Sequence, residues 1–200
     1  ETGTAQSEAV LLHPVALAPR YARLPDGTSR EIGMPQSCIE AVHPSPRLTY
    51  TEAPTEVRSG VYVTGPVPRQ TDFEDAGGPF FADPACRQPD EFPDDQALYF
   101  DTPRGTVVVL GCAHAGIVNT LRYVQVLTKN RPVHAVIGGT HLVAASPERM
   151  DKTVEELRRI DMQRLMPAHC TGFPAMARLW QEFPCQYAPC PTGTVIEMEE

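Results

Sequence analysis

Residues 106–119, TVVVLGCAHAGIVN, decide the fold of this 200-residue chain. β-Branched and apolar residues run up to Gly111, His114 follows in a short polar stretch, and an apolar helical pattern opens at Ile117. A strand, a loop and a helix therefore succeed one another here. His114 lies in the loop that leaves the carboxyl end of the strand, which is where ligands collect in open α/β sheets.

The same arrangement recurs twice downstream. The predicted strand Val133–Ile137 leads through two glycines to His141, and the short strand Arg164–Met166 leads to His169. Neighbouring strands that run in parallel end at the same edge of a sheet. We therefore expect the imidazoles of His114 and His169 to converge on one pocket, with His141 beside them.

Strand and helix patterns alternate from residue 96 onward, which indicates a layered α/β architecture. In the last helix we expect Met176, Leu179 and Trp180 to face the core. The predicted elements are a hairpin of strands at 96–102 and 106–111, helices at 117–128, 147–160 and 174–183, and a final strand at 194–198.

The first half of the chain is punctuated by proline and glycine. Residues 1–59 are predicted to be irregular apart from a strand at Ala9–Leu12, and residues 66–95 are predicted to be loop. Asp94 and Asp95 stand before a strand, where paired aspartates are typical of solvated turns.

Composition excludes several classes of partner. The chain has 17 basic and 25 acidic residues, a net charge of −8 and no Lys/Arg cluster, so we predict no nucleic-acid partner. No apolar run approaches the ~20 residues of a membrane helix. Six cysteines without a CxxC pair, in a chain large enough for a core, predict reduced thiols and a cytoplasmic location.

Small residues surround His114, His141 and His169, so the backbone can approach a ligand and the imidazole is the side chain with reach. Neutral imidazole is the commonest metal ligand, and the pattern predicts a metal site. Cys170 is an alternative thiolate ligand beside His169. Adjacent side chains diverge, however, so we expect Cys170 to be a small buried residue. A redox protein that uses Cys112 and Cys170 is a further alternative.

Three segments, GCAHAGIVNTLRYV (111–124), AVIGGTHLV (135–143) and PAHCTGFPA (167–175), resemble the second half of the metallo-β-lactamase superfamily in order and spacing. More narrowly, they resemble the branch that includes the archaeal dihydropterin-methyl-aminobenzene ribofuranosyl phosphate synthases and bacterial hydrolases of unassigned substrate. The segments at 19–35, 61–74 and 93–102 are also similar to that branch.

The resemblance implies a four-layer αββα sandwich with the metals at the shared edge of two similar halves. Residues 1–200 would form a partial domain, mainly its C-terminal half: residues 1–95 a loop-rich tail with lid segments, and residues 96–200 the second αβ half. The superfamily signature HxHxDH does not occur in these 200 residues. By the order of segments in the superfamily we expect it upstream of residue 1, in the same chain or a separate one. The chain begins at Glu1 without a methionine, so we expect it to be a piece of a longer protein.

The activity implied is that of a metal-dependent hydrolase acting on a small anionic substrate, phosphorylated or ester-containing, through metal-activated water. By resemblance His114 completes one metal site and His169 a second, with two zinc ions expected and manganese, iron or magnesium as alternatives. The bridging aspartate of the superfamily has no clear counterpart, so His141 is either a ligand or a substrate contact. Arg23 and Arg69 are predicted anion contacts.

Two alternatives to hydrolysis stay open. The first is a pterin-type transferase that releases pyrophosphate, and the second is a non-catalytic fragment without the main metal-binding motif. Expected partners are the anionic substrate, the upstream half of the fold and, as a further alternative, a second copy of the chain. Sequence alone identifies neither a catalytic residue nor the substrate.

Overall fold

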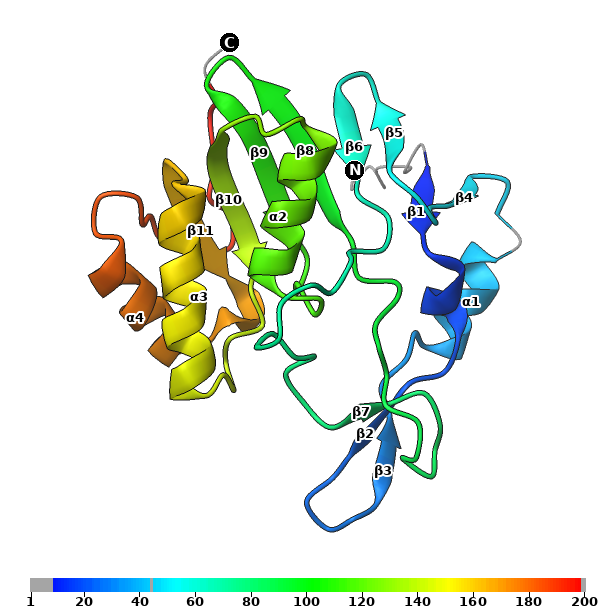
Figure 1. Ribbon diagram of the computed structural model, residues 1–200. Coiled ribbons are helices and arrows are strands. Elements are labelled where there is room, and N and C mark those ends of the chain that lie inside the picture. Colours follow the sequence, from blue (N-terminus) through cyan, green and yellow to red (C-terminus); the bar gives the residue numbers. More distant parts are fainter. Residues whose placement is uncertain (1–8, 44, 199–200) are drawn as a thin grey trace. The chain divides into compact units, whose positions relative to one another are not determined.

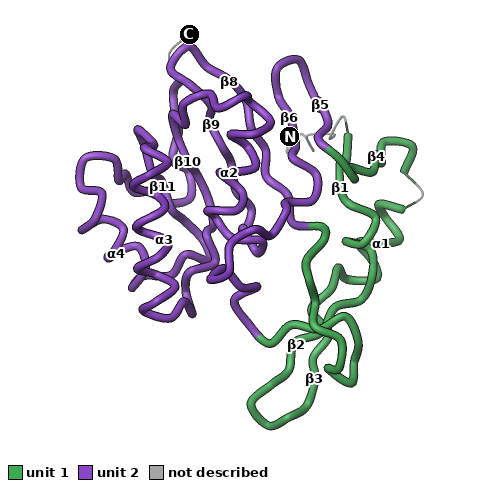
Figure 2. The backbone as a smooth tube through the Cα atoms, viewed as in Figure 1, with its two compact units in different colours: residues 1–53, 79–94 green, residues 54–78, 95–200 purple. Residues whose placement is uncertain are grey.

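The computed structural model describes residues 9–43 and 45–198 (Figure 1). They divide into two compact units: residues 9–43, 45–53 and 79–94 in one, and residues 54–78 and 95–198 in the other (Figure 2). Each unit has sheets of its own, and every strand of a given sheet comes from a single unit.

The larger unit is built on a six-stranded sheet with the order β11-β10-β9-β8-β6-β5. Strands β9, β10 and β11 pair in parallel, and the remaining neighbours pair antiparallel. The strands are β5 (Thr55–Arg58), β6 (Val61–Val63), β8 (Ala97–Thr102), β9 (Gly105–Leu110), β10 (Val133–Gly139) and β11 (Arg164–Ala168).

The predicted hairpin before His114 is confirmed. Strands β8 and β9 pair from Ala97 opposite Leu110 to Thr102 opposite Gly105. The Thr102 hydroxyl donates a hydrogen bond to the Gly105 carbonyl at 2.8 Å and closes the two-residue turn. Pairing along its whole length fixes β9, and therefore the point at which the His114 loop begins.

The three predicted helices are confirmed, each within one residue at either end. They are α2 (Ile117–Leu127), α3 (Pro147–Ile160) and α4 (Phe173–Glu182). Helix α3 begins where the Ser146 hydroxyl accepts the Arg149 N–H at 3.1 Å and Pro147 takes the first turn. It ends at Asp161, whose φ of 56° lies in the left-handed region.

Helices α2 and α3 lie over the same face of the sheet, where they bury its core (Figure 1). Ile117, Leu121 and Val124 recur along one side of α2 with no exposed surface, as their spacing predicts. They pack with apolar side chains of α3, α4 and the strands, among them Leu157, Leu179, Val108, Val136 and Leu165.

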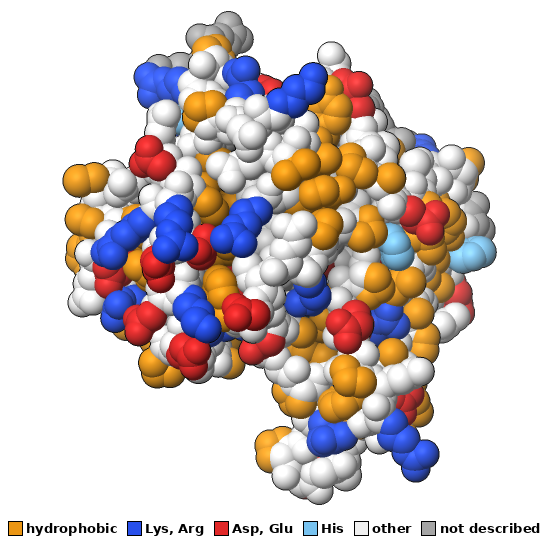
Figure 3. All heavy atoms as spheres, viewed as in Figure 1, with side chains coloured by type: hydrophobic (Ala, Val, Ile, Leu, Met, Phe, Trp, Pro, Cys, Tyr) orange, Lys and Arg blue, Asp and Glu red, His pale blue; other side chains and the backbone are white. Residues whose placement is uncertain are grey.

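The outer side of α3 is charged. Figure 3 shows basic and acidic side chains interspersed over this helix. Arg159 pairs with Glu155 and Glu156 on the same helix, and Arg122 of α2 reaches Glu156 at 2.5 Å. Exposed pairs of this kind each contribute under about 1 kcal/mol, so they keep this face hydrated more than they hold the fold.

The smaller unit contains more structure than its sequence predicts. The strand at the start is confirmed as β1, but treating the other described residues up to 59 as irregular was wrong, and so was treating all of residues 66–95 as loop. Residues 1–8 and 44 lie outside the described part of the chain. Strands of two or three residues are too short for an alternating pattern to register. The elements are β1 (Val10–Leu12) beside β4 (Leu48–Tyr50), the sheet of β3 (Ser29–Glu31), β2 (Tyr21–Arg23) and β7 (Phe80–Phe81), the 3₁₀ turn η1 (Pro14–Leu17) and α1 (Gln36–Val42).

Two expectations near the C-terminus were wrong. Residues 194–198 form no strand, and Val195 is 85% exposed. The chain instead pairs earlier with β11, through a bridge between Tyr187 and Leu165. Trp180 is 62% exposed, because Leu179 and Ala175, one helical turn apart, set the buried side of α4.

No helix in the described part of the chain combines the length and the apolar character that crossing a membrane requires.

The packing of α2 yields a stability prediction. Leu121→Ala removes a side chain with no exposed surface and should lower the free energy of unfolding by about 2–5 kcal/mol. Val126→Ala on the same helix, at a site 70% exposed, should change it by less than about 0.5 kcal/mol. Urea denaturation followed by circular dichroism measures both, and equal effects would contradict the assigned buried face.

Candidate functional site

Three histidine loops leave the same edge of the six-stranded sheet. His114 follows the end of β9, His141 follows β10, and His169 comes directly after β11. The three strands are adjacent and parallel, and Gly138 of β10 pairs with Leu110 on one side and Pro167 on the other. The structure therefore brings the three predicted loops together.

His114 and His141 are in ring contact. Their centroids lie 4.1 Å apart, with the rings tilted by 43°. His114 Nδ1 lies 3.1 Å from the Ala76 carbonyl oxygen, which can only accept a hydrogen bond. Nδ1 therefore carries the proton and Nε2 keeps a lone pair. Burial lowers the pKa of His114, which favours the neutral ring that metal ligation requires.

The backbone around His114 is held by two side chains. The Asp95 carboxylate accepts the Ala115 N–H at 2.8 Å, and the Arg69 guanidinium donates to the His114 carbonyl at 2.8 Å. Burial raises the pKa of Asp95. The expectation that Asp95 is a solvated turn residue was therefore wrong, since its carboxylate is used to bind a loop amide.

Glu74 supplies the cap that α2 lacks. Gly116 at the start of the helix offers no side chain, and the buried Glu74 carboxylate accepts the Val118 N–H at 2.9 Å and the Asn119 N–H at 2.8 Å. A negative charge at this end of a helix is favourable. A Cβ on Gly116 would lie 2.2 Å from the carboxyl carbon of Glu74, so only glycine allows this approach.

A further ion pair sets the segment that carries Ala76. The side chain of Arg149 is 4% exposed and pairs with Asp75, whose carboxylate also accepts the Gly77 N–H at 2.7 Å. These contacts hold the backbone on both sides of the Ala76 carbonyl. A Cβ on Gly77 would lie 2.1 Å from His141 Cδ2, so this segment passes directly against that imidazole.

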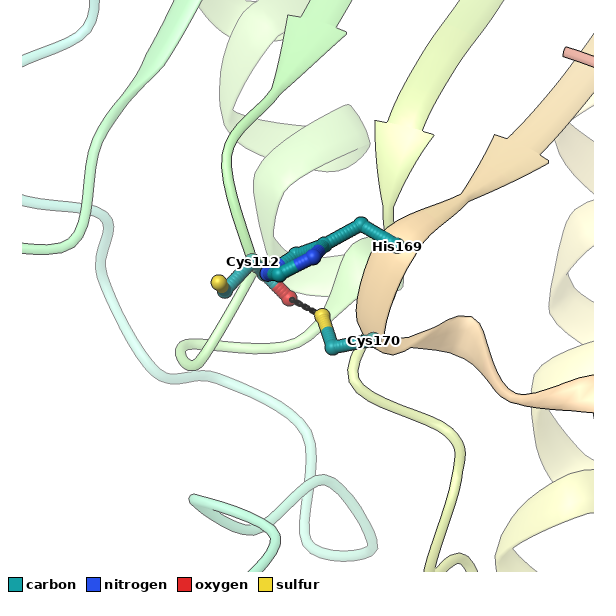
Figure 4. A group of neighbouring side chains, drawn as sticks. All are labelled: Cys112, His169 and Cys170. Carbon is teal, nitrogen blue, oxygen red and sulfur yellow. Dashed lines mark hydrogen bonds between the residues drawn. The ribbon is translucent and has the colours of Figure 1, made fainter. Parts of the chain in front are cut away.

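Cys112, His169 and Cys170 form a second group at the same edge (Figure 4). One ligand atom from each lies within 4.8 Å of the other two. Cys170 Sγ lies 3.5 Å from the Cys112 carbonyl oxygen. Hydrogen bonds from the Cys112 thiol and from His141 lower the pKa of Cys170 to about 4, while the same interaction with Cys170 raises the pKa of Cys112.

The expectation that His169 and Cys170 diverge was wrong. It assumed extended backbone, whereas His169 has φ of 51° and opens the 3₁₀ turn η2 (His169–Thr171). Ala113 and His141 also have positive φ, at 54° and 48°. Left-handed backbone in residues other than glycine is costly and concentrates at functional sites. Three such residues in three adjacent loops mark this edge.

A groove adjoins His169. Its volume is about 720 Å³, within the usual range for small-molecule sites. Its walls are mostly apolar and come from η2, α4 and the segment after α4, with Phe173, Met176, Tyr187 and Cys190 among them.

The two predicted anion contacts have different settings. Arg69 lies beside the His114 loop, as described above. Arg23 belongs to the smaller unit, where its guanidinium donates to the Cys86 carbonyl at 2.5 Å and lies 4.6 Å from the centroid of the Phe81 ring. Substrate binding by either arginine stays a prediction.

The donor set of the larger unit suits a transition metal. Imidazoles and thiols bind zinc, iron and copper in preference to calcium or magnesium. Metal-ligating histidines commonly use one ring nitrogen to contact a backbone carbonyl, as His114 Nδ1 does with the Ala76 carbonyl. The metal roles of His114, His141 and His169 remain predictions.

A solved structure with a similar backbone decides the fold family. Tm1679, described as a metal-dependent hydrolase of the β-lactamase superfamily, aligns with 96% of this chain and 72% of its own, with a TM-score of 0.79 and 26% sequence identity. The chain has the metallo-β-lactamase superfamily fold. The mixed α/β class predicted from the sequence is thereby confirmed, and so is the resemblance to the superfamily.

Two Methanocaldococcus jannaschii proteins are distant homologues of this metallo-β-lactamase-fold chain. The uncharacterized protein MJ0448 is 31% identical over 172 residues, which are 86% of this chain and 62% of that protein. The 7,8-dihydropterin-6-methyl-4-(β-D-ribofuranosyl)-aminobenzene-5′-phosphate synthase is 32% identical over 108 residues, 54% of this chain and 37% of the synthase. The chain thus spans less than two thirds of either relative. No protein-family model matches it.

Several residues of this metallo-β-lactamase-fold site escape sequence reasoning. Glu74 and Asp95 act on backbone amides far along the chain, and nothing in their own neighbourhoods signals it. Cys112 and Cys170 carried a weak signal, since each lies beside a predicted strand end that also holds a histidine. The paired glycines before His141 were the sign that these strand ends approach closely.

Burial of Glu74 makes stability depend on pH. The effect of burial exceeds that of the hydrogen bonds and raises the pKa of Glu74 above the usual value near 4.5. The protonated side chain therefore contributes fully to the free energy of unfolding below pH 4.5, and this contribution is lost as the pH rises through the folded-state pKa. The free energy of unfolding of the wild type relative to Glu74→Gln should therefore fall with rising pH, by up to about 1.4 kcal/mol per unit.

Urea denaturation at a series of pH values from below 4.5 upward measures the difference in free energy of unfolding between the wild type and Glu74→Gln. Glu155→Gln, on the exposed side of α3, serves as the control and should change the free energy of unfolding by less than about 0.5 kcal/mol. A wild-type to Glu74→Gln difference that stays constant with pH would contradict a carboxyl group whose pKa is raised on folding.

Proposed function

We propose that this chain is part of a metal-dependent hydrolase that acts on a small anionic substrate, phosphorylated or ester-containing. The observation that carries the proposal is His114, whose Nδ1 is committed to the Ala76 carbonyl and whose ring contacts His141. The similarity to Tm1679, itself described as a metal-dependent hydrolase, supports the reaction class.

His114 and His169 are the proposed metal ligands, and His141 is proposed either as a further ligand or as a substrate contact beside them. A pair of divalent ions, zinc in the first instance, would supply an activated water and polarise the bond to be cleaved. The remaining ligands would come from an HxHxDH segment outside these 200 residues, which would also complete a four-layer αββα sandwich. The free thiols of the chain suit a reducing compartment, and we propose a cytoplasmic location.

The chain's own side chains would position substrate and ligands. The bonds from Asp95 and Arg69 hold the His114 backbone, and Ala76 orients the ring. A guanidinium matches the oxygens of an anionic substrate, which makes Arg69 the proposed anion contact in this unit and Arg23 that of the smaller unit. The apolar groove beside His169 would take the uncharged part of the substrate.

A transferase is the second candidate. The segment of 108 residues shared with the pterin synthase supports a reaction in which pyrophosphate departs from a phosphorylated substrate. The same histidines would then hold the metal, and Arg69 would contact the leaving group. Release of pyrophosphate, rather than of orthophosphate or an alcohol, separates this reaction from hydrolysis.

The complete native protein tests the proposal through its histidines. His114→Ala and His169→Ala should each abolish hydrolysis of phosphate mono- and diesters and reduce bound metal, because each removes a ligand. His141→Ala should retain part of the metal, with affinity lowered about 10- to 100-fold, as for side chains that support ligands. Elemental analysis and a chromogenic phosphoester assay measure the two effects.

His43→Ala is the control, because this residue ends α1 in the smaller unit. It should keep both metal and activity. The proposal would be contradicted by a purified wild-type protein without a transition metal, or by His114→Ala and His169→Ala variants with wild-type turnover. The alternative of a non-catalytic fragment predicts that the wild-type protein holds no transition metal.

The upstream half of the fold is the proposed partner. In a four-layer sandwich two sheets pack face to face, so a chain separated from the other half presents apolar surface that drives association. Gel filtration with light scattering of the isolated 200-residue chain should show self-association, or a complex with the upstream half. A stable monomer over a wide concentration range would contradict this partner.

A further inference from the structure

Two thiols and one imidazole converge beside the proposed centre. Cys112 lies just after β9, and His169 and Cys170 open the 3₁₀ turn that follows β11. Their ligand atoms all lie within 4.8 Å of one another, and Figure 4 shows the His169 ring reaching across toward Cys112 with the Cys170 sulfur beneath.

The end of β10 lets these groups meet. Strand β10 runs between β9 and β11, and neighbouring strands lie about 4.8 Å apart, so Cys112 and Cys170 must span two such spacings. The intervening residue is Gly139. A Cβ there would lie 2.8 Å from Cys170 Sγ and 3.3 Å from the Cys112 Cα, so any side chain would fill the space that the thiols share.

The turn after β11 brings the neighbours His169 and Cys170 to one side. In an extended strand, successive side chains point to opposite faces. His169 instead has a φ of 51° and begins η2, so the two ligand atoms lie within reach of one ion. The left-handed backbone at His169 thus places the His169 and Cys170 side chains on the same side of the chain.

We propose that Cys112, Cys170 and His169 form a binding site for one soft divalent ion of the zinc class. Around tetrahedral zinc, sulfur at about 2.3 Å and nitrogen at about 2.0–2.1 Å lie roughly 3.5–3.8 Å from one another. The three ligand atoms lie within 4.8 Å of one another, about 1 Å beyond this spacing at most. Three protein ligands leave a fourth position for water or substrate, and a cysteine that is protonated before binding gives its proton to solvent as its bond to the metal forms.

This site differs in chemistry from the imidazole pair. Thiolates select zinc, cadmium or cobalt over magnesium and calcium, whereas His114 and His141 offer nitrogen alone. The inference rests on the proposed function only through His169, which both donor sets share. Binding of the ion by the two thiols does not require turnover.

Cobalt(II) tests the site, because its bonds to thiolate absorb in the near ultraviolet and its bonds to imidazole do not. Metal-free native protein kept reduced with a phosphine should develop this charge-transfer band on titration with cobalt. Cys112→Ser and Cys170→Ser should each remove about half of the band and weaken binding at least about tenfold, and the double variant should lose the band. Cys190→Ser, at a half-buried cysteine of the nearby groove, should keep it.

A second measurement needs no variant. Zinc bound to the wild-type protein should protect Cys112 and Cys170 from alkylation by iodoacetamide, as measured by peptide mass spectrometry. Cys185 is exposed and should react equally with and without zinc. This comparison holds even where a serine variant fails to fold.

The outcomes separate this inference from the proposed function. If cobalt binds without a charge-transfer band and this binding is lost in His114→Ala, the thiol site is overturned and the hydrolase proposal stands. A band that persists in the double cysteine variant, or equal alkylation of Cys112 with and without zinc, would also overturn it. Absence of any transition-metal binding would overturn both.

Discussion

The absence of side chains at the carboxyl end of β10 is the constraint on which the candidate site depends. A Cβ on Gly138 would lie 2.1 Å from the Leu110 carbonyl oxygen, and one on Gly139 would lie 2.4 Å from that of Gly111. Strands β9 and β10 can approach this closely only because both residues are glycine. The loops that carry His114, His141 and His169 therefore begin at one place. The Cys112 and Cys170 thiols lie close together in the space that a side chain at Gly139 would fill.

Two carboxylates, the buried Glu74 and the partly buried Asp95, hold the loops in position once the strands have brought them together. Glu74 and Asp95 accept backbone N–H groups from the start of α2 and from the His114 loop. Taking a carboxylate out of water is unfavourable, and burial raises the pKa of both groups. The hydrogen bonds and the positive end of the helix offset part of that cost. The result is a His114 backbone tied to two segments distant in sequence.

Backbone strain at the site is sustained by the surrounding hydrogen bonds. His141 and His169 occupy the left-handed region, which costs of order 1–3 kcal/mol for a residue with a side chain. The Thr171 hydroxyl donates to the Ala168 carbonyl at 2.7 Å and lies 3.0 Å from the buried Thr140 hydroxyl. These bonds link the two loops and keep both histidines in conformations that an isolated loop would not hold.

The sequence by itself determined the hairpin, the two further parallel strands and the three helices of the larger unit, although not β5 or the C-terminal segment. The run of β-branched residues into Gly111, the 3.6-residue spacing of Ile117, Leu121 and Val124, and the cap at Ser146 are local signals, and local physics decides them. The order of these elements also predicted that His114, His141 and His169 share one edge, because adjacent parallel strands end together.

Tertiary structure alone decided which side chains act at that edge. Glu74 and Asp95 bind amides more than 19 residues away along the chain, and the Cys112 thiol reaches Cys170 across a strand that lies between them. The 3₁₀ turn that begins at His169 ends the alternation of side chains along β11, and it sets the direction of the His169 and Cys170 side chains. Hydrogen bonds and packing between distant segments select these conformations, so no local pattern in the chain records them.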